Sequence, residues 1–265
     1  MKTTNRFFLA MAIMLLLFSS SVIFAQDEAE SPAYISVTKM FWNKNYDSSI
    51  DEWKAVEKEY MDKVTKKNAH ITGAWYYTHL LTDNSNEVLY VQSYSNWEAM
   101  GKARVRNVEL EKEAWADEAA RKAFLKKLNA AFSSFHSDEI YVTIDGAKPI
   151  ANAPTEDMVM YIRQNKMAFP EDGTEKEFMA LYKKIQENVI HKNENIKGYY
   201  PSIHAWGSDR RDFNEAILIE SLGDLEKLFD RNKELMKEAL TEDESKALGK
   251  YFEYHGDYIY TAVKL

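Results

Sequence analysis

Residues 49–79, SIDEWKAVEKEYMDKVTKKNAHITGAWYYTH, have a second version 125 positions later, at residues 174–204, TEKEFMALYKKIQENVIHKNENIKGYYPSIH. Both stretches contain a hydroxyl residue three positions before a glutamate, then a Lys-Asn pair, an Ile-x-Gly step and a final histidine. Order and spacing are kept together, which is the signature of an internal repeat. We therefore interpret the chain as two tandem copies of one folding unit.

Two further blocks extend the repeat with other offsets. An offset of 128 aligns Asn86-Glu87 with Asn214-Glu215 and places Gln92 opposite Glu220. An offset of 119 aligns Ile140-Tyr141 with Ile259-Tyr260 near the end of each copy. We expect the offset to change only within loops.

Each copy has the pattern β-α-β-β-α-β. Alternating, β-rich runs predict strands at residues 34–41, 74–81, 87–93 and 139–144, and again at 158–164, 199–206, 215–221 and 258–263. Capping boxes at Ser49 and Thr174 open amphipathic helices with apolar residues every three or four positions. Asn96 and Asp224 are expected N-caps of a second helical region, which is split in both copies, with residues 116–135 as a separate helix in the first.

This order is the split βαβ unit, whose helices cover one face of a four-stranded sheet. The other face needs a partner, and the second copy can supply it. We predict an α+β fold in which two fused ferredoxin-like units form a pseudo-dimeric α/β barrel with a central space between the sheets. The predicted boundaries are 1–25 for a signal peptide, 26–147 for the first repeat, 148–157 for a linker and 158–265 for the second repeat.

The doubled unit resembles the dimeric α/β-barrel superfamily, which includes antibiotic-biosynthesis monooxygenases, NIPSNAP-like proteins and haem-handling relatives. The resemblance covers roughly residues 33–265 and rests on element order and duplication. It implies activities that range from cofactor-free oxygenases to haem enzymes, and some members have no known activity. Fold alone does not decide among them.

The first 25 residues resemble a secretory signal. Lys2 and Arg6 precede an apolar run at residues 7–18, and Ala25 precedes an acidic, polar stretch. We expect cleavage after Ala25, no stable membrane anchor after that cleavage, and a periplasmic or secreted protein. The alternative is an uncleaved anchor at residues 7–25.

Composition excludes several classes of function. The chain has 265 residues and a formal net charge of −8, without basic clusters, so nucleic acid is not an expected partner. It has no cysteine, which excludes disulfides, thiolate catalysis and cysteine-ligated metal sites. The standard motifs for nucleotide binding, zinc proteolysis and serine hydrolysis are missing, and no metal site is predicted.

The candidate ligand-binding residues lie mainly on one hairpin strand of each copy. Period-two alternation places Trp75, Tyr77 and His79 on one face of the first copy. The same alternation gives the second-copy set, Tyr200, His204 and Trp206. Aromatic walls with a few polar groups suit a flat apolar ligand, and a histidine there could accept a proton or ligate a metal or haem iron. The alternative is a histidine that is simply satisfied by hydrogen bonds.

Three other polar residues complete the candidates. Gln92 and Glu220 are expected to match in the second hairpin strand, and Glu220 beside His204 could form a general base. Arg163 could pair with Glu220 or hold an anionic ligand. The alternative for Glu220 is a strand-end carboxylate that faces water.

We therefore expect an exported protein that binds a small apolar or aromatic ligand between its sheets. A second hypothesis is a cofactor-free or haem-dependent monooxygenase that uses His79, His204 or Glu220, which makes haem a candidate cofactor. A third is a non-catalytic envelope interaction protein. A monomer and a homodimer are both compatible with the sequence, as are an enzyme and a non-enzyme.

Overall fold

The computed structural model describes residues 34–152 and 154–265, so the predicted signal peptide lies outside the described residues. Eight antiparallel strands form a closed barrel in the order β1-β3-β2-β8-β5-β7-β6-β4. They are β1 (Tyr34–Trp42), β2 (Gly73–Leu81), β3 (Glu87–Tyr94), β4 (Phe132–Thr143), β5 (Met158–Met167), β6 (Gly198–Trp206), β7 (Asp212–Ile219) and β8 (Phe252–Val263). The predicted duplicated α+β barrel is confirmed.

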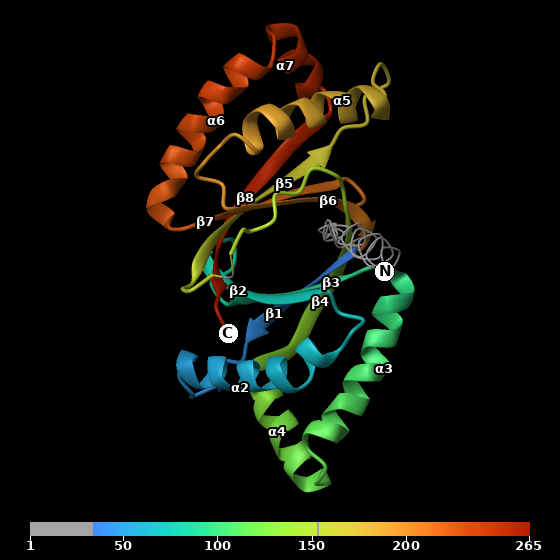
Figure 1. The fold of residues 1–265 in the computed structure, drawn as a ribbon, viewed down its shortest axis with the longest axis vertical. Coiled ribbons are helices and arrows are strands. Elements are labelled where there is room, and N and C mark those ends of the chain that lie inside the picture. The colour runs from blue at the N-terminus through green and yellow to red at the C-terminus, as the bar shows by residue number, and fades with distance from the viewer. Residues whose placement is uncertain (1–33, 153) are drawn as a thin grey trace, which may run out of the picture. The chain divides into compact units, whose positions relative to one another are not determined.

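Helices cover the outside of the barrel. Those of the first half are α2 (Ile50–Lys63), α3 (Trp97–Ala114) and α4 (Glu118–Ala130), and those of the second are α5 (Glu175–Ile185), α6 (Leu225–Ala239) and α7 (Glu242–Gly249). Figure 1 shows one set on the lower sheet and the other on the upper sheet. None of the helices in the described part of the chain has the length and apolarity that a membrane span requires.

The helix starts follow from local sequence. The Ser49 hydroxyl accepts from the Glu52 backbone N–H, and the Glu52 carboxylate accepts from the Ser49 backbone N–H, which completes the predicted capping box. Thr174 caps α5 with its hydroxyl, but the Glu177 carboxylate turns instead to the Tyr251 hydroxyl. Asn96 caps α3 as predicted.

Two buried asparagines make the same contacts in both halves. Asn68 donates its side-chain amide to the Ala103 carbonyl (2.8 Å), which ties the end of the first helix to α3. Asn193 donates to the Leu228 carbonyl (3.1 Å) in the same way. Both pairs are related by an offset of 125, so the duplication extends to the three-dimensional contacts.

The predicted offset of 128 in the second hairpin strand is wrong. The pairing of β2 with β3 places Gly73 opposite Ser93, and that of β6 with β7 places Gly198 opposite Leu218. Ser93 therefore corresponds to Leu218, and the offset remains 125 through the hairpin. The two hairpin loops have the same length, so no insertion separates the copies at this point.

The closing strands are longer than predicted. β4 begins at Phe132 and β8 at Phe252, where the sequence analysis placed the strand starts at residues 139 and 258. Phe135 therefore lies in a strand and not at the end of a helix. Both extra segments are largely exposed on either face, so they lack the apolar alternation that reveals a half-buried strand.

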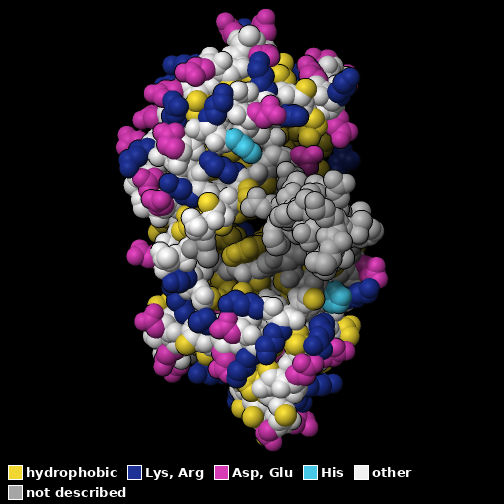
Figure 2. Space-filling model, viewed as in Figure 1, with side chains coloured by type: hydrophobic (Ala, Val, Ile, Leu, Met, Phe, Trp, Pro, Cys, Tyr) yellow, Lys and Arg dark blue, Asp and Glu magenta, His cyan; other side chains and the backbone are white. Residues whose placement is uncertain are grey.

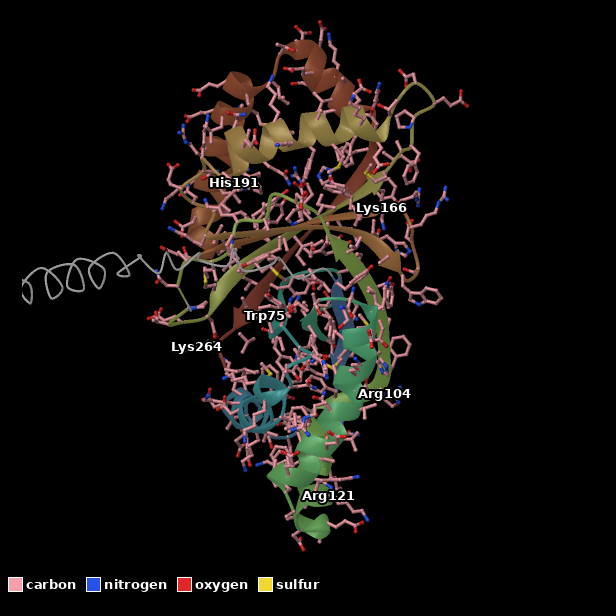
Figure 3. The ribbon with its side chains drawn as sticks, turned by 45° about the vertical axis from the view of Figure 1, so that its right-hand side comes forward. Trp75, Arg104, Arg121, Lys166, His191 and Lys264 are labelled. Carbon is pink, nitrogen blue, oxygen red and sulfur yellow. The ribbon has the colours of Figure 1, made fainter. Side chains whose placement is uncertain are left out.

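Strand direction defines two ends of the barrel. Each strand is antiparallel to both neighbours in the closed order, so β1, β2, β5 and β6 all run the same way. The starts of these four strands lie at one end, which we call the Trp75 end, and their last residues lie at the other, which we call the Lys166 end. Figure 3 labels both residues.

Candidate functional site

The barrel interior contains most of the predicted site residues. Residues that face each other across neighbouring strands share a face of the sheet. Tyr77, Leu89, Met160, Leu218 and Tyr260 form one buried cluster that draws on both halves, so this face points inward. An eight-stranded barrel is just wide enough for side chains to fill it or for one small ligand.

Aromatic rings lie over glycines at the Trp75 end. The ring of Trp75 covers Gly73 so closely that a Cβ there would clash with Cη2 of the indole. Tyr200 covers Gly198 in the second half, where a Cβ would lie 3.1 Å from its ring. The Ile150 backbone N–H donates to the Tyr200 hydroxyl (3.2 Å), so the linker covers this ring. Trp75 stays 46% exposed, and in Figure 2 the hollow between the halves shows hydrophobic side chains.

The centre of the barrel is packed. Tyr77, Met160 and Leu218 meet there, and partly buried residues such as Val91 and Ile162 pack around them. Burial raises the pKa of Tyr77 above its usual range, with a further contribution from the nearby Tyr200. The middle layer therefore separates the two ends of the barrel.

Buried tyrosine–carboxylate pairs occupy the interior toward the Lys166 end. The Tyr260 hydroxyl donates to Glu87 Oε1 (2.8 Å), and Glu87 forms an ion pair with Lys39 (3.2 Å). The matching pair is formed by the Tyr141 hydroxyl on β4, which donates to Asp212 Oδ2 on β7 (3.3 Å), so each pair joins the two halves. Burial, followed by the adjacent carboxylate, raises the pKa of both tyrosines, so both remain protonated donors.

The two candidate histidines correspond by position but differ in their partners. His79 Nδ1 lies 2.8 Å from the Thr82 hydroxyl, whereas His204 Nδ1 is buried and has no hydrogen-bond partner among the described residues. The residue that corresponds to Thr82 is Gly207, which has φ 143° and at which a Cβ would clash with Glu139 Oε2. A side chain is therefore excluded at the position that would cap His204.

Trp206 does not line the barrel, and that prediction is wrong. Tyr141 pairs with His204, but the next pair joins Ile140 to Trp206, so β6 has an irregularity between His204 and Trp206. A bulge reverses the face on which later residues lie. Trp206 is accordingly 68% exposed. β2 has the same irregularity between His79 and Leu81.

Gln92 and Arg163 face the helices and not the barrel interior. Gln92 follows the inward Val91, and its Oε1 accepts from the Tyr94 hydroxyl (2.9 Å). Arg163 follows the inward Ile162, and its Nε donates to Asp257 Oδ1 (3.2 Å). Neither residue can contact a ligand inside the barrel from this face.

The predicted place of Glu220 beside His204 is also wrong. It follows the last residue of β7 and pairs with Lys197 on the surface (3.1 Å). His204 lies toward the other end of the hairpin, because β6 and β7 are antiparallel. Glu220 therefore cannot act as a base together with His204, and the alternative of a strand-end carboxylate is the correct one.

The carboxylates of the buried pairs, Glu87 and Asp212, are not among the site residues predicted from the sequence. Glu87 corresponds to Asp212 only at an offset of 125, and the offset of 128 hid this correspondence. Tyr141 and Tyr260 were aligned by sequence, but nothing local indicated that both point inward. The signal that could have found the pairs is the offset of 125 at residues 49–79, because its continuation without an insertion aligns Glu87 with Asp212.

The residues present do not fit haem. His204 lies in the barrel, whose centre is filled by side chains from both halves. The space between sheet and helices in the second half is filled by an apolar cluster that contains Phe178, Tyr182 and Phe213. His191, beside that cluster, has its Nε2 2.9 Å from the Gly146 carbonyl. Among the described residues, no group of three or more His, Asp or Glu side chains could hold a metal ion.

Comparison with known proteins finds likeness only in three dimensions. No family model and no curated protein matches the sequence. A putative monooxygenase from Fusobacterium nucleatum matches with a TM-score of 0.56 and 9% identity over 89% of this chain and 94% of that one. Chlorite dismutase from Candidatus Nitrospira defluvii matches with a TM-score of 0.53 and 13% identity over 89% and 92%. A putative monooxygenase from Lactobacillus acidophilus matches with a TM-score of 0.50 and 11% identity over 88% and 94%. The chain thus shares with these proteins the fold of two fused ferredoxin-like units that close into one α/β barrel.

Proposed function

We propose that the protein binds a small, flat, apolar or aromatic molecule at the Trp75 end of the barrel. The observation that carries the proposal is the environment of Trp75. One side of its indole covers Gly73, and the side chain is nevertheless 46% exposed at the mouth of a barrel. An indole held in place with a free face is a stacking surface for a planar ligand.

The surroundings match that ligand class. The inward residues next to this end, Met158, Ala262 and Ile150, are apolar and pack around the barrel centre. Small-molecule sites are concave and mostly apolar, with few polar groups. The packed centre limits the depth that a ligand can reach, so we expect binding at the mouth and not through the barrel.

The test uses N-phenyl-1-naphthylamine, an uncharged aromatic dye whose fluorescence rises in apolar surroundings. We expect saturable binding that Trp75→Ala weakens about twofold to twelvefold, because an aromatic stacking contact is worth about 0.5 to 1.5 kcal/mol. Trp206→Ala is the matched control, because Trp206 is more exposed but lies outside the barrel. Equal losses in both variants, or no loss with Trp75→Ala, would refute the site.

A second candidate function is proton transfer at the Lys166 end. It is favoured by His204 Nδ1, a buried atom that has no hydrogen-bond partner in the described part of the chain. Two of the solved structures with this fold are named putative monooxygenases. A neutral imidazole can remove a proton from an acidic aromatic hydroxyl, and the resulting anion is easier for dioxygen to oxidise. Haem has no part in this proposal, because the residues do not fit it.

Dioxygen uptake with 1,4-dihydroxynaphthalene tests this candidate. The quinol loses two protons and two electrons to give the quinone, and dioxygen becomes hydrogen peroxide. We expect the protein to accelerate uptake above the buffer rate, His204→Gln to abolish the acceleration and His79→Gln to keep it, since His79 Nδ1 already contacts Thr82. Uptake equal to that in buffer, or equal losses in both variants, would remove His204 from this role.

A further inference from the structure

A separate cavity of about 430 Å³ lies on the first half, on the rim of the Lys166 end. It is formed where β1 ends and β3 and β4 begin, together with the loop that follows β1. Cavities of this size hold small organic molecules. The residues that matter here are Phe41, Trp42, Lys44, Asn45 and Phe135.

One wall of the cavity is aromatic and well anchored. The rings of Phe41 and Phe135 lie 5.5 Å apart at 31°. Trp42 stacks on Phe132 (5.4 Å) and meets Trp53 edge to face (5.0 Å), so the core fixes its position. Phe135 is 69% exposed in the middle of a strand, where packing does not require an aromatic ring.

The polar side of the cavity offers donors without partners. Lys44 forms no ion pair with any residue in the described part of the chain. The Asn45 side chain likewise has no hydrogen bond to a described residue, and only its backbone N–H bonds, to Asn43 Oδ1. None of the described residues that line the cavity is acidic. An aromatic wall beside a free ammonium group matches a ligand that carries a ring and a negative charge.

The second half provides an internal comparison. Strand pairing makes Lys166 the counterpart of Phe41, and an offset of 125 makes Phe169 the counterpart of Lys44. Lys166 is bonded to Asp212 and Asp209, and Phe169 is covered by Arg210 (5.4 Å). The fold therefore requires neither an aromatic ring at the position of Phe41 nor a lysine without an ion pair at the position of Lys44.

We propose that this cavity binds a small aromatic carboxylate, with the ring against Phe41 and Phe135 and the carboxylate at Lys44. The probe is 2-naphthoate, measured by isothermal titration calorimetry beside the neutral isostere 2-naphthalenemethanol. We expect one site with a dissociation constant below 1 mM for the carboxylate, weaker binding of the alcohol, and loss of affinity with added salt.

Variants locate the site. We expect Phe135→Ser to lower the affinity for 2-naphthoate at least fivefold. Tyr254 is the counterpart of Phe135 on the surface of β8, and we expect Tyr254→Ser to leave this affinity unchanged. Lys44→Met should lower the affinity for the carboxylate several-fold and leave the affinity for the alcohol unchanged. Trp75→Ala should have no effect, which separates this cavity from the Trp75 end.

Three results would overturn the proposal: no saturable binding of 2-naphthoate below several millimolar, wild-type affinity in Phe135→Ser, or equal affinity for the alcohol and the carboxylate in the wild type. Phe135 and Lys44 are exposed, so their variants are expected to fold, and circular dichroism checks this.

Discussion

Replacing Glu57 with glutamine should stabilise the protein at neutral pH. Glu57 lies on α2 and is almost completely buried, and it accepts hydrogen bonds from Trp53 Nε1 (3.2 Å) and the Tyr76 hydroxyl (2.8 Å). Burial raises the pKa of Glu57 from 4.5 to about 7, and the two hydrogen bonds lower it by less. Glutamine keeps an acceptor for Trp53 and places an amide donor toward Tyr76, without a charge.

The sign and size of the effect follow from proton linkage. Between pH 4.5 and about 7 the folded protein keeps a proton on Glu57 that the unfolded chain has lost. The contribution of Glu57 to stability is therefore fully present below pH 4.5 and is lost as the pH rises through about 7. At about 1.36 kcal/mol per pKa unit, the total loss is about 3 kcal/mol, of which about 2.5 kcal/mol falls between pH 5 and pH 8.

Urea unfolding at pH 5 and pH 8 measures this difference. The free energy of unfolding of Glu57→Gln minus that of the wild type should be about 2 to 3 kcal/mol larger at pH 8 than at pH 5. The m-value should not change. Glu59→Gln is the control on the same helix, because Glu59 is partly exposed and paired with Lys63 (2.7 Å). The reasoning is refuted if the free energy of unfolding of Glu57→Gln differs from that of the wild type by the same amount at both pH values.

Other substitutions test the equivalence of the two halves and the roles of two glycines. Asn68→Ala and Asn193→Ala should each cost about 2 kcal/mol by urea unfolding. Each removes a buried side-chain hydrogen bond to a helix carbonyl and also the acceptor of a backbone N–H, that of His70 or of Asn195. A cost in one half only would mean that the two anchors are not equivalent. Gly207→Ala should lower the melting temperature, since its φ of 143° and the contact with Glu139 exclude a Cβ. Gly101→Ala, in open space within α3, should instead stabilise by about 0.5 to 1 kcal/mol.

Local signals were sufficient to predict the architecture. The caps at Ser49, Thr174 and Asn96 and the three- and four-residue apolar spacing mark helix starts, and alternation marks the half-buried strands. These features depend on neighbouring residues only, so they can be seen in a single sequence. The repeat then supplied the long-range information that two sheets must meet.

The candidate site depended on features that are not local. Period-two alternation placed Tyr77 and His79 on the inward face correctly, but it failed at Trp206, after the irregularity that follows His204. A bulge leaves no composition signal in the strand that contains it. The prediction for Arg163 is wrong for a different reason. Alternation divides the residues of a strand between two faces, and only the packing in three dimensions shows which face points into the barrel.

The tandem connection itself makes the two halves unequal at the Trp75 end. β4 ends and β5 begins at this end of the barrel, so the segment that joins them has to cross it. Ile150 in that segment reaches Tyr200, whereas Trp75, which occupies the corresponding position in the first half, stays exposed. Two separate identical chains would have no such connection, and both rings would have the same environment. Gene fusion can therefore convert a symmetric mouth into one covered ring and one free ring, which is the asymmetry that a single ligand site requires.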